Sequence, residues 1–207
     1  MSVTLKLARL LEVLRAGEAL AADVAKRQSQ LARADWMARA LQVQAAQERG
    51  HAAMAAAALK LTDLRGARTG MPDVTARLRA RIEHDLDAGN LAASLLGLQG
   101  VVEHLGEALL ESLGRFDHPA GAILHALRVK VLAQEHGHVL LGARCLQALT
   151  PSGGALALDV LDEYRALGRD SAIQVTALLD DARLDANVFW RGVDTRLSDW
   201  YTHTPHA

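Results

Sequence analysis

The sequence predicts an all-α protein: a four-helix bundle made of two antiparallel hairpins joined by a long crossover, followed by C-terminal helices. Half of the 207 residues are apolar, and most of these are Ala and Leu, which favour helices. Aromatic residues make up only 3% of the chain, and β-branched residues are sparse. The four prolines fall where the 3.6-residue periodicity breaks, as expected if helices run between them.

The first hairpin is predicted over residues 4–62. Residues 4–29 carry an apolar stripe with charged residues opposite, which indicates a half-buried helix. A short polar turn follows at residues 32–35, where Asp35 is a candidate N-cap, and a second helix runs to about Thr62. Because the turn is short, we expect the two helices to pack side by side in opposite directions.

A crossover over residues 63–90 leads to the second hairpin. Within the crossover, residues 72–87 could form a polar surface helix. A helix over residues 91–113 and another that starts with Pro119 at its first position and ends near Thr150 form the second hairpin. Two hairpins joined in this way describe a four-helix bundle.

We expect one domain over residues 1–207, because the chain is too short for two of ordinary size. Residues 1–150 form the bundle, residues 151–202 a C-terminal helical extension and residues 203–207 a tail. The extension gathers four aromatic residues, which we expect in the core or at a subunit contact. They are Phe189, Trp190, Trp200 and Tyr201.

Charge and cysteine content exclude several classes of protein. With 23 Lys and Arg against 24 Asp and Glu, a nucleic-acid partner is not indicated. The single cysteine, Cys145, excludes an intramolecular disulfide and any metal site built from cysteine pairs. No apolar stretch approaches the roughly 18 residues of a membrane span, and the amphipathic N-terminal segment is unlike a signal peptide. We therefore expect a cytoplasmic protein.

Two Glu-x-x-His motifs lie in the second helix of each hairpin: Glu48 with His51, and Glu135 with His138. On a helix, residues i and i+3 share a face, so each motif can present a carboxylate and an imidazole to one metal ion. Apolar residues lie on the same side of each helix, which predicts that both motifs face the bundle core.

Two further glutamates complete a candidate metal site. Glu18 and Glu48 lie equally far from the first predicted turn, and Glu103 and Glu135 lie equally far from the second. In an antiparallel hairpin such residues sit at the same height, so the four carboxylates should form one layer. Glu107 shares the face of Glu103 one turn further on, and is either an additional ligand or a group that contacts a ligand.

Four carboxylates in a bundle core require compensation. They would repel one another and lose hydration, which costs several kcal/mol per ion unless something offsets it. Two divalent cations supply four positive charges, and the two imidazoles complete the coordination. Carboxylate and imidazole ligands suit iron or manganese. We predict two iron ions, with two manganese ions or a mixed Mn/Fe pair as alternatives.

The order of these residues, one Glu and then Glu-x-x-His in each hairpin, resembles the ferritin-like di-iron and di-manganese carboxylate proteins. The resemblance covers Glu18 to His138 and implies a ferritin-like four-helix bundle. It also implies that Glu18 and Glu103 are single-carboxylate ligands and that Glu48 and Glu135 are bridging carboxylates. The terminal imidazole ligands that it implies are His51 and His138. The spacings look most like the small hydroxylases and oxidases, such as the demethoxyubiquinone hydroxylase and tRNA hydroxylase families.

The resemblance implies an enzyme that activates O2 to hydroxylate or oxidise a small organic substrate. Electrons would come from an external ferredoxin or reductase, because the chain holds no flavin or iron–sulfur motif, and a homodimer is compatible with the pattern. The substrate would enter near Gly97, Gly100 and Gly106, where small side chains leave space. Three alternatives stay open: an iron-oxidising storage protein, a di-manganese catalase-like enzyme and a metal-free interaction bundle.

Overall fold

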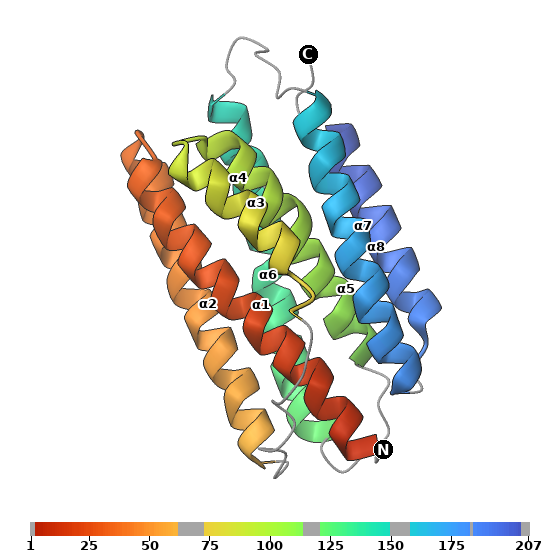
Figure 1. Ribbon diagram of the computed structural model, residues 1–207. Coiled ribbons are helices and arrows are strands. Elements are labelled where there is room, and N and C mark those ends of the chain that lie inside the picture. Colours follow the sequence, from red (N-terminus) through yellow and green to blue (C-terminus); the bar gives the residue numbers. More distant parts are fainter. Residues whose placement is uncertain (1–2, 62–72, 114–120, 150–157, 183, 204–207) are drawn as a thin grey trace.

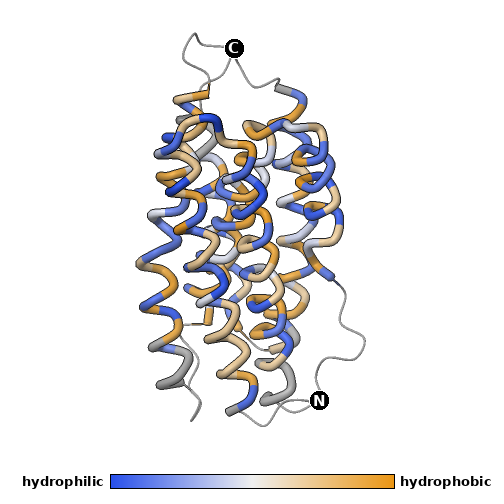
Figure 2. Tube along the Cα trace, turned by 90° about the vertical axis from the view of Figure 1, so that its left-hand side faces the viewer, coloured by the Kyte–Doolittle hydropathy of each residue, from blue (hydrophilic) through white to orange (hydrophobic). Residues whose placement is uncertain are grey.

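The long helices of the protein run alongside one another, parallel or antiparallel to a common axis (Figure 1). The structure is a computed structural model that describes residues 3–61, 73–113, 121–149, 158–182 and 184–203. Within these ranges the backbone is helical apart from short turns and contains no strand, which confirms the all-α prediction. Hydrophobic and hydrophilic residues recur periodically along the helices, as in amphipathic helices (Figure 2).

The first hairpin consists of α1 (Val3–Leu31) and α2 (Asp35–Leu61), which pack along their whole length. Both helices agree with their predicted boundaries to within two residues. Asp35, the predicted N-cap, is instead the first residue of α2, a difference of one position. Leu11, Leu14 and other apolar residues of the predicted stripe of α1 are buried against α2 and the core.

The next helical segment is continuous but not uniform. It consists of α4 (Leu91–Gly97), a π-helical turn η2 (Leu98–Val102) and α5 (Glu103–Leu113). Asn90 caps its start, since the Asn90 side chain accepts a hydrogen bond from the backbone N–H of Ala93. The prediction of one regular helix over residues 91–113 was therefore wrong in its middle, where hydrogen bonds run from residue i to i+5 and widen the turn.

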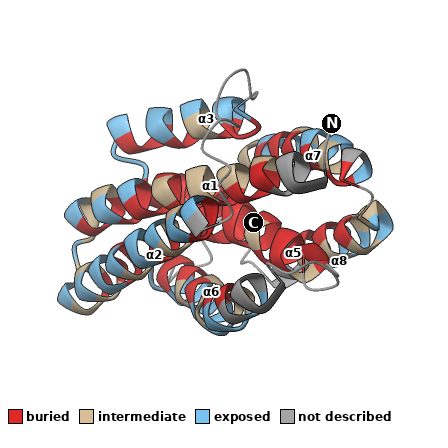
Figure 3. Ribbon diagram, turned by 90° about the horizontal axis from the view of Figure 1, so that it is seen from below, coloured by how far each residue is buried: buried red, intermediate tan, exposed pale blue. Residues whose placement is uncertain are grey.

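The fourth helix of the bundle is α6 (Gly121–Leu149), which packs against α5 and α2. Its end agrees with the predicted end near Thr150, whereas the predicted turn after residue 113 and the start at Pro119 lie outside the described residues. In cross-section, α5 lies at the centre of the molecule and is buried on nearly all sides (Figure 3). The bundle therefore surrounds α5 with helices from both ends of the chain.

The crossover does contain a helix, α3 (Ala76–Asp87), which packs against α4, α1 and α7. Only one side of α3 lies on the surface. On the other side, Leu78, Ile82 and Leu86 form a buried stripe. The carboxylate of Asp85 is buried as well and accepts a hydrogen bond from the Tyr164 hydroxyl over 2.6 Å. The crossover is thereby part of the core.

The C-terminal extension consists of α7 (Leu158–Asp181) and α8 (Ala186–His203). α8 packs against α5, and α7 packs against α1 and α3. Phe189 is fully buried and Trp190 half-buried, as expected of core residues, whereas the side chains of Trp200 and Tyr201 lie outside what the structure describes. Among the described helices, none has the length and apolar character needed to cross a membrane.

Candidate metal centre

All six predicted ligand residues come together in the interior of the bundle. They are supplied by four different helical segments, and each side chain is buried, with at most 7% of its residue surface exposed. The six residues are Glu18 of α1, Glu48 and His51 of α2, Glu103 of α5, and Glu135 and His138 of α6.

The ligand atoms form two overlapping sets, and in each set they lie within 4.8 Å of one another. The first set is Glu18, Glu48, His51 and Glu135. The second set is Glu48, Glu103, Glu135 and His138. Since Glu48 and Glu135 belong to both sets, each is placed where a carboxylate could bridge two ions.

Each histidine turns its Nδ1 atom toward the carboxylates. Nδ1 of His51 lies 3.0 Å from Glu48 Oε2, 3.3 Å from Glu18 Oε2 and 3.2 Å from Glu135 Oε1. Nδ1 of His138 lies 2.7 Å from Glu48 Oε1 and 3.4 Å from Glu135 Oε2. The two rings face one another with their centroids 6.2 Å apart. Both imidazoles can therefore offer Nδ1 to an ion between the carboxylates.

The opposite ring nitrogens contact two glutamines that the sequence analysis missed. Nε2 of His51 lies 2.7 Å from Oε1 of Gln134, and Nε2 of His138 lies 2.9 Å from Oε1 of Gln47. The signal was present in the sequence, because a Gln directly precedes the Glu of both motifs.

A chain of buried amides also reaches the centre from the π-helical turn. Gln44 donates a hydrogen bond to Oε1 of Glu103 over 2.7 Å. Gln99, in η2, donates hydrogen bonds to Gln44 over 3.0 Å and to Gln28 over 2.9 Å. Gln28, Gln44 and Gln99 are all at most 1% exposed, so these polar groups satisfy one another in the core.

The four carboxylates differ in their ionisation. Burial raises the pKa of Glu18 and of Glu103 well above the usual value, and repulsion by Glu135 and Glu48 adds to the rise. Burial also acts to raise the pKa of Glu48 and of Glu135. At these two groups hydrogen bonds outweigh burial and lower the pKa. Both histidines form the hydrogen bonds with Glu48, and Glu103 and both histidines form those with Glu135.

The histidines respond to the same carboxylates. Burial opposes the charged form of each ring, but contacts with the surrounding glutamates outweigh it and raise the pKa of His51 and of His138 to about 12. These shifts favour protonated imidazoles and protonated Glu18 and Glu103 beside ionised Glu48 and Glu135.

The donor set fits two divalent cations. Protons and cations are alternative ways to neutralise these carboxylates, and metal binding to such ligands displaces protons. Oε1 of Glu135 is buried and lies 3.2 Å from Nδ1 of His51, close enough for one ion to replace a proton shared between them. Carboxylate oxygens and imidazole nitrogens are the ligands that iron and manganese use in proteins.

Glu107 lies outside both ligand sets. Its carboxylate forms an ion pair with Arg196 of α8, with Nε of Arg196 2.9 Å from Oε2 of Glu107. His104, on the same helix, has its Nδ1 3.1 Å from the carbonyl oxygen of Gly100, and burial lowers the pKa of His104 to about 4. The ion pair of Glu107 with Arg196 therefore joins α5 to α8, and the contact of His104 joins α5 to the π-helical turn before it.

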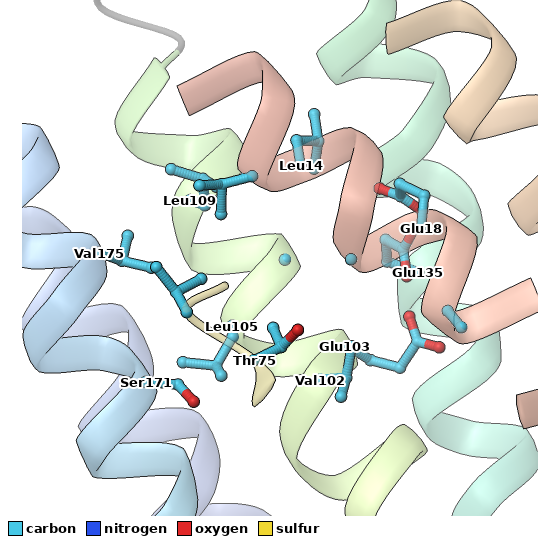
Figure 4. Close-up of a pocket in the computed structure, with 15 residues that line it drawn as sticks. Leu14, Glu18, Thr75, Val102, Glu103, Leu105, Leu109, Glu135, Ser171 and Val175 are labelled. Carbon is cyan, nitrogen blue, oxygen red and sulfur yellow. The ribbon is translucent and has the colours of Figure 1, made fainter. Parts of the chain in front are cut away.

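An apolar pocket opens beside the centre between α1, α5 and α7 (Figure 4). Its empty volume is about 560 Å³, including open solvent at its mouth. The carboxylates of Glu18, Glu103 and Glu135 lie at one end, whereas Leu109 and Val175 lie toward the other. The pocket could hold an apolar molecule with one end at the carboxylates.

One of the three glycines expected near the substrate entrance borders this pocket. Gly106 lines the pocket, together with Gly17 of α1. Gly97 and Gly100 do not line the pocket, and Gly97 serves close packing, because a Cβ atom there would lie 2.5 Å from the Tyr164 ring. The contact between Gly97 and α7 depends on a residue far along the chain.

The whole chain is similar in structure to a solved protein from Synechococcus, protein 19, which has aldehyde deformylating oxidase activity. The TM-score is 0.82, the sequences are 19% identical, and the match covers 100% of this chain and 93% of that chain. No protein-family model and no curated protein sequence matches the chain. The chain has the ferritin-like helical-bundle fold that its residue pattern resembles.

Proposed function

We propose that this protein is a di-iron oxidase or oxygenase that uses O2 to oxidise an apolar organic substrate. The observation that carries the proposal is a pair of buried ligand sets that share Glu48 and Glu135 and border an apolar pocket. A storage or purely structural bundle has no need for an apolar cavity that ends at the carboxylates of Glu18, Glu103 and Glu135.

The six buried side chains have distinct roles in this proposal. Glu18 and His51 would hold one ion, Glu103 and His138 would hold the other, and Glu48 and Glu135 would serve both. When bound, a pair of iron ions supplies the redox chemistry and the open coordination positions that reduction of O2 requires. The surrounding helices keep bulk water away from the ligands, since all six are nearly fully buried.

The pocket indicates the kind of substrate. Its wall is built mainly from aliphatic side chains such as Leu14, Leu105 and Val175. Its carboxylates gather at one end, and Thr75 and Ser171 add two hydroxyl groups elsewhere in the wall. This arrangement suits an apolar molecule that presents one oxidisable end to the metal centre. The activity of the Synechococcus protein supports the inclusion of aldehydes among the substrates to be tested. Electrons would come from an external donor.

The test begins with metal content. Protein stripped with a chelator is loaded anaerobically with Fe(II), and we expect two iron ions per chain. O2 uptake is then followed with an artificial electron mediator and a panel of aliphatic aldehydes, alcohols and hydrocarbons of increasing length. Products are analysed by gas chromatography and mass spectrometry, with isotopically labelled O2 to trace the oxygen atoms.

Each alternative predicts a different result. Uptake of many iron ions by a large oligomer would favour storage, and two manganese ions with peroxide turnover would favour a catalase-like enzyme. Absence of metal after anaerobic loading would leave an interaction bundle. Any of these outcomes would overturn the proposed function.

A further inference from the structure

Two glutamines link α2 and α6 reciprocally at the metal centre. Gln134 of α6 contacts Nε2 of His51 on α2, at 2.7 Å, while Gln47 of α2 contacts Nε2 of His138 on α6, at 2.9 Å. Each glutamine thus directly precedes one Glu-x-x-His motif and contacts the histidine of the other motif.

The reciprocity follows from the helix geometry. Gln47 and His51 are four residues apart, as are Gln134 and His138, so each pair lies on one helix face. Position 47 pairs with 138 and position 51 pairs with 134, which is the register of two antiparallel helices. A glutamine four residues before each histidine is therefore level with the histidine of the opposite helix.

The contact has a defined chemical consequence. An amide oxygen only accepts hydrogen bonds, so the ring nitrogen beside it must keep its proton, and Nε2–H donates to the glutamine. The other nitrogen, Nδ1, then faces the carboxylates, where a metal ion would bind. A neutral amide fixes the ring in this way without adding a negative charge behind it, unlike the carboxylate that often contacts a metal-bound histidine.

We infer that Gln47 and Gln134 are positioning residues that hold His138 and His51, respectively, with Nδ1 toward the two metal sites. This inference rests on the proposed metal centre but makes its own predictions. Neither glutamine belongs to a ligand set, and both are half-buried at the edge of the centre. Each glutamine acts on the ion held by the histidine of the opposite motif.

The experiment titrates the metal-free full chain with cobalt(II) and follows the visible absorption of the ion. Gln47→Leu and Gln134→Leu should each weaken binding of one of the two ions by about 10- to 100-fold. Gln47→Glu and Gln134→Glu restore an acceptor, so affinity should return to the wild-type value or exceed it. In the iron-loaded protein the Glu variants should have a more negative reduction potential. Gln42→Leu, an exposed change on α2, is the matched control.

A second measurement does not depend on metal. In the metal-free protein labelled with nitrogen-15 at histidine, we expect Nε2–H of His51 to lose its protection from exchange in Gln134→Leu, and His138 in Gln47→Leu. Wild-type cobalt affinity in both Leu variants, or unchanged ring-proton protection, would overturn this inference alone. A wild-type chain that binds no cobalt would overturn the proposed function, and the nitrogen-15 spectra would still decide whether the glutamines hold the rings.

Discussion

Gln44 joins α2 to α5 at the metal centre, because its Nε2 atom donates a hydrogen bond to Oε1 of Glu103 over 2.7 Å. The same amide accepts a hydrogen bond from Gln99 over 3.0 Å, so the carboxylate is connected to the π-helical turn through one side chain. This arrangement orients Glu103 through a neutral amide.

Replacement of Gln44 by Leu should destabilise the protein. The change removes one hydrogen-bond partner from the buried amide of Gln99 and one from the buried carboxyl group of Glu103, which costs about 1–3 kcal/mol in free energy of unfolding. Urea unfolding of the metal-loaded protein measures the effect. Gln42→Leu, at an exposed position of the same helix, should change the stability little, and an equal loss in both variants would contradict the prediction.

Replacing a glutamate of both ligand sets and replacing a glutamate of one set should leave different numbers of bound metal ions. Glu135 belongs to both ligand sets, so Glu135→Ala should abolish binding of both ions, whereas Glu18→Ala should leave one ion bound by the second set. Elemental analysis after dialysis gives the number of ions per chain. The thermal unfolding temperature should fall further for Glu135→Ala, because bound metal stabilises the folded state by linkage. Equal stoichiometry in the two variants would refute shared coordination.

Metal binding near neutral pH should release protons. The raised pKa values of Glu18, Glu103, His51 and His138 favour a bound proton on each group in the absence of metal, so two cations should displace up to about four protons. Calorimetric titration in two buffers with different ionisation enthalpies counts these protons. Metal binding without proton release would show that the centre is already ionised.

The metal-free protein should become less stable as pH rises. Histidines with a raised pKa stabilise the fold fully below the ordinary value of 6.5, and this contribution is lost progressively as pH rises toward about 12. The raised pKa values of Glu18 and Glu103 also lower the stability of the metal-free fold as pH rises above the ordinary carboxyl value of 4.5. Thermal unfolding at increasing pH, with and without metal, should show a steep decline only in the metal-free protein.

Gly106 should control the size of the pocket. A Cβ atom built at Gly106 meets no heavy atom within 4 Å, so Gly106→Ala should raise stability by up to about 1 kcal/mol through helix propensity. Gly106→Leu should fill the pocket and raise KM for the largest substrates, while the metal content stays at the wild-type level. Gly97→Ala is the contrasting change, since its Cβ atom would clash with Tyr164 and destabilise the fold.

Local patterns predicted much of the fold and all six residues of the two ligand sets. Apolar periodicity and short breaks gave the limits of α1 and α2 to within two residues, because these limits depend on nearby sequence. The ligand residues could be found because two Glu-x-x-His spacings and equal distances from two turns are visible without a structure.

The features that were missed depend on contacts between distant segments. The roles of Gln47 and Gln134 follow from the antiparallel register of α2 and α6, which a single helix pattern does not contain. Gly97 was expected beside the substrate, but it meets Tyr164 of α7, 67 positions further along the chain. The π-helical turn at Leu98–Val102 lies in a segment that is apolar nearly all round, so hydropathy could not locate it.

The π-helical turn is a place where the chain can be one residue shorter and keep the metal centre. A π-helical turn holds one more residue than an α-helical turn, so removal of one residue from Leu98–Val102 would let the turn close into an α-helix while its two flanks keep nearly the same relative rotation. Gln99 lies in this turn and Glu103 directly follows it, and both reach Gln44. A related sequence that is one residue shorter here can therefore keep the ligand positions of this centre, and an alignment should place the gap in this turn.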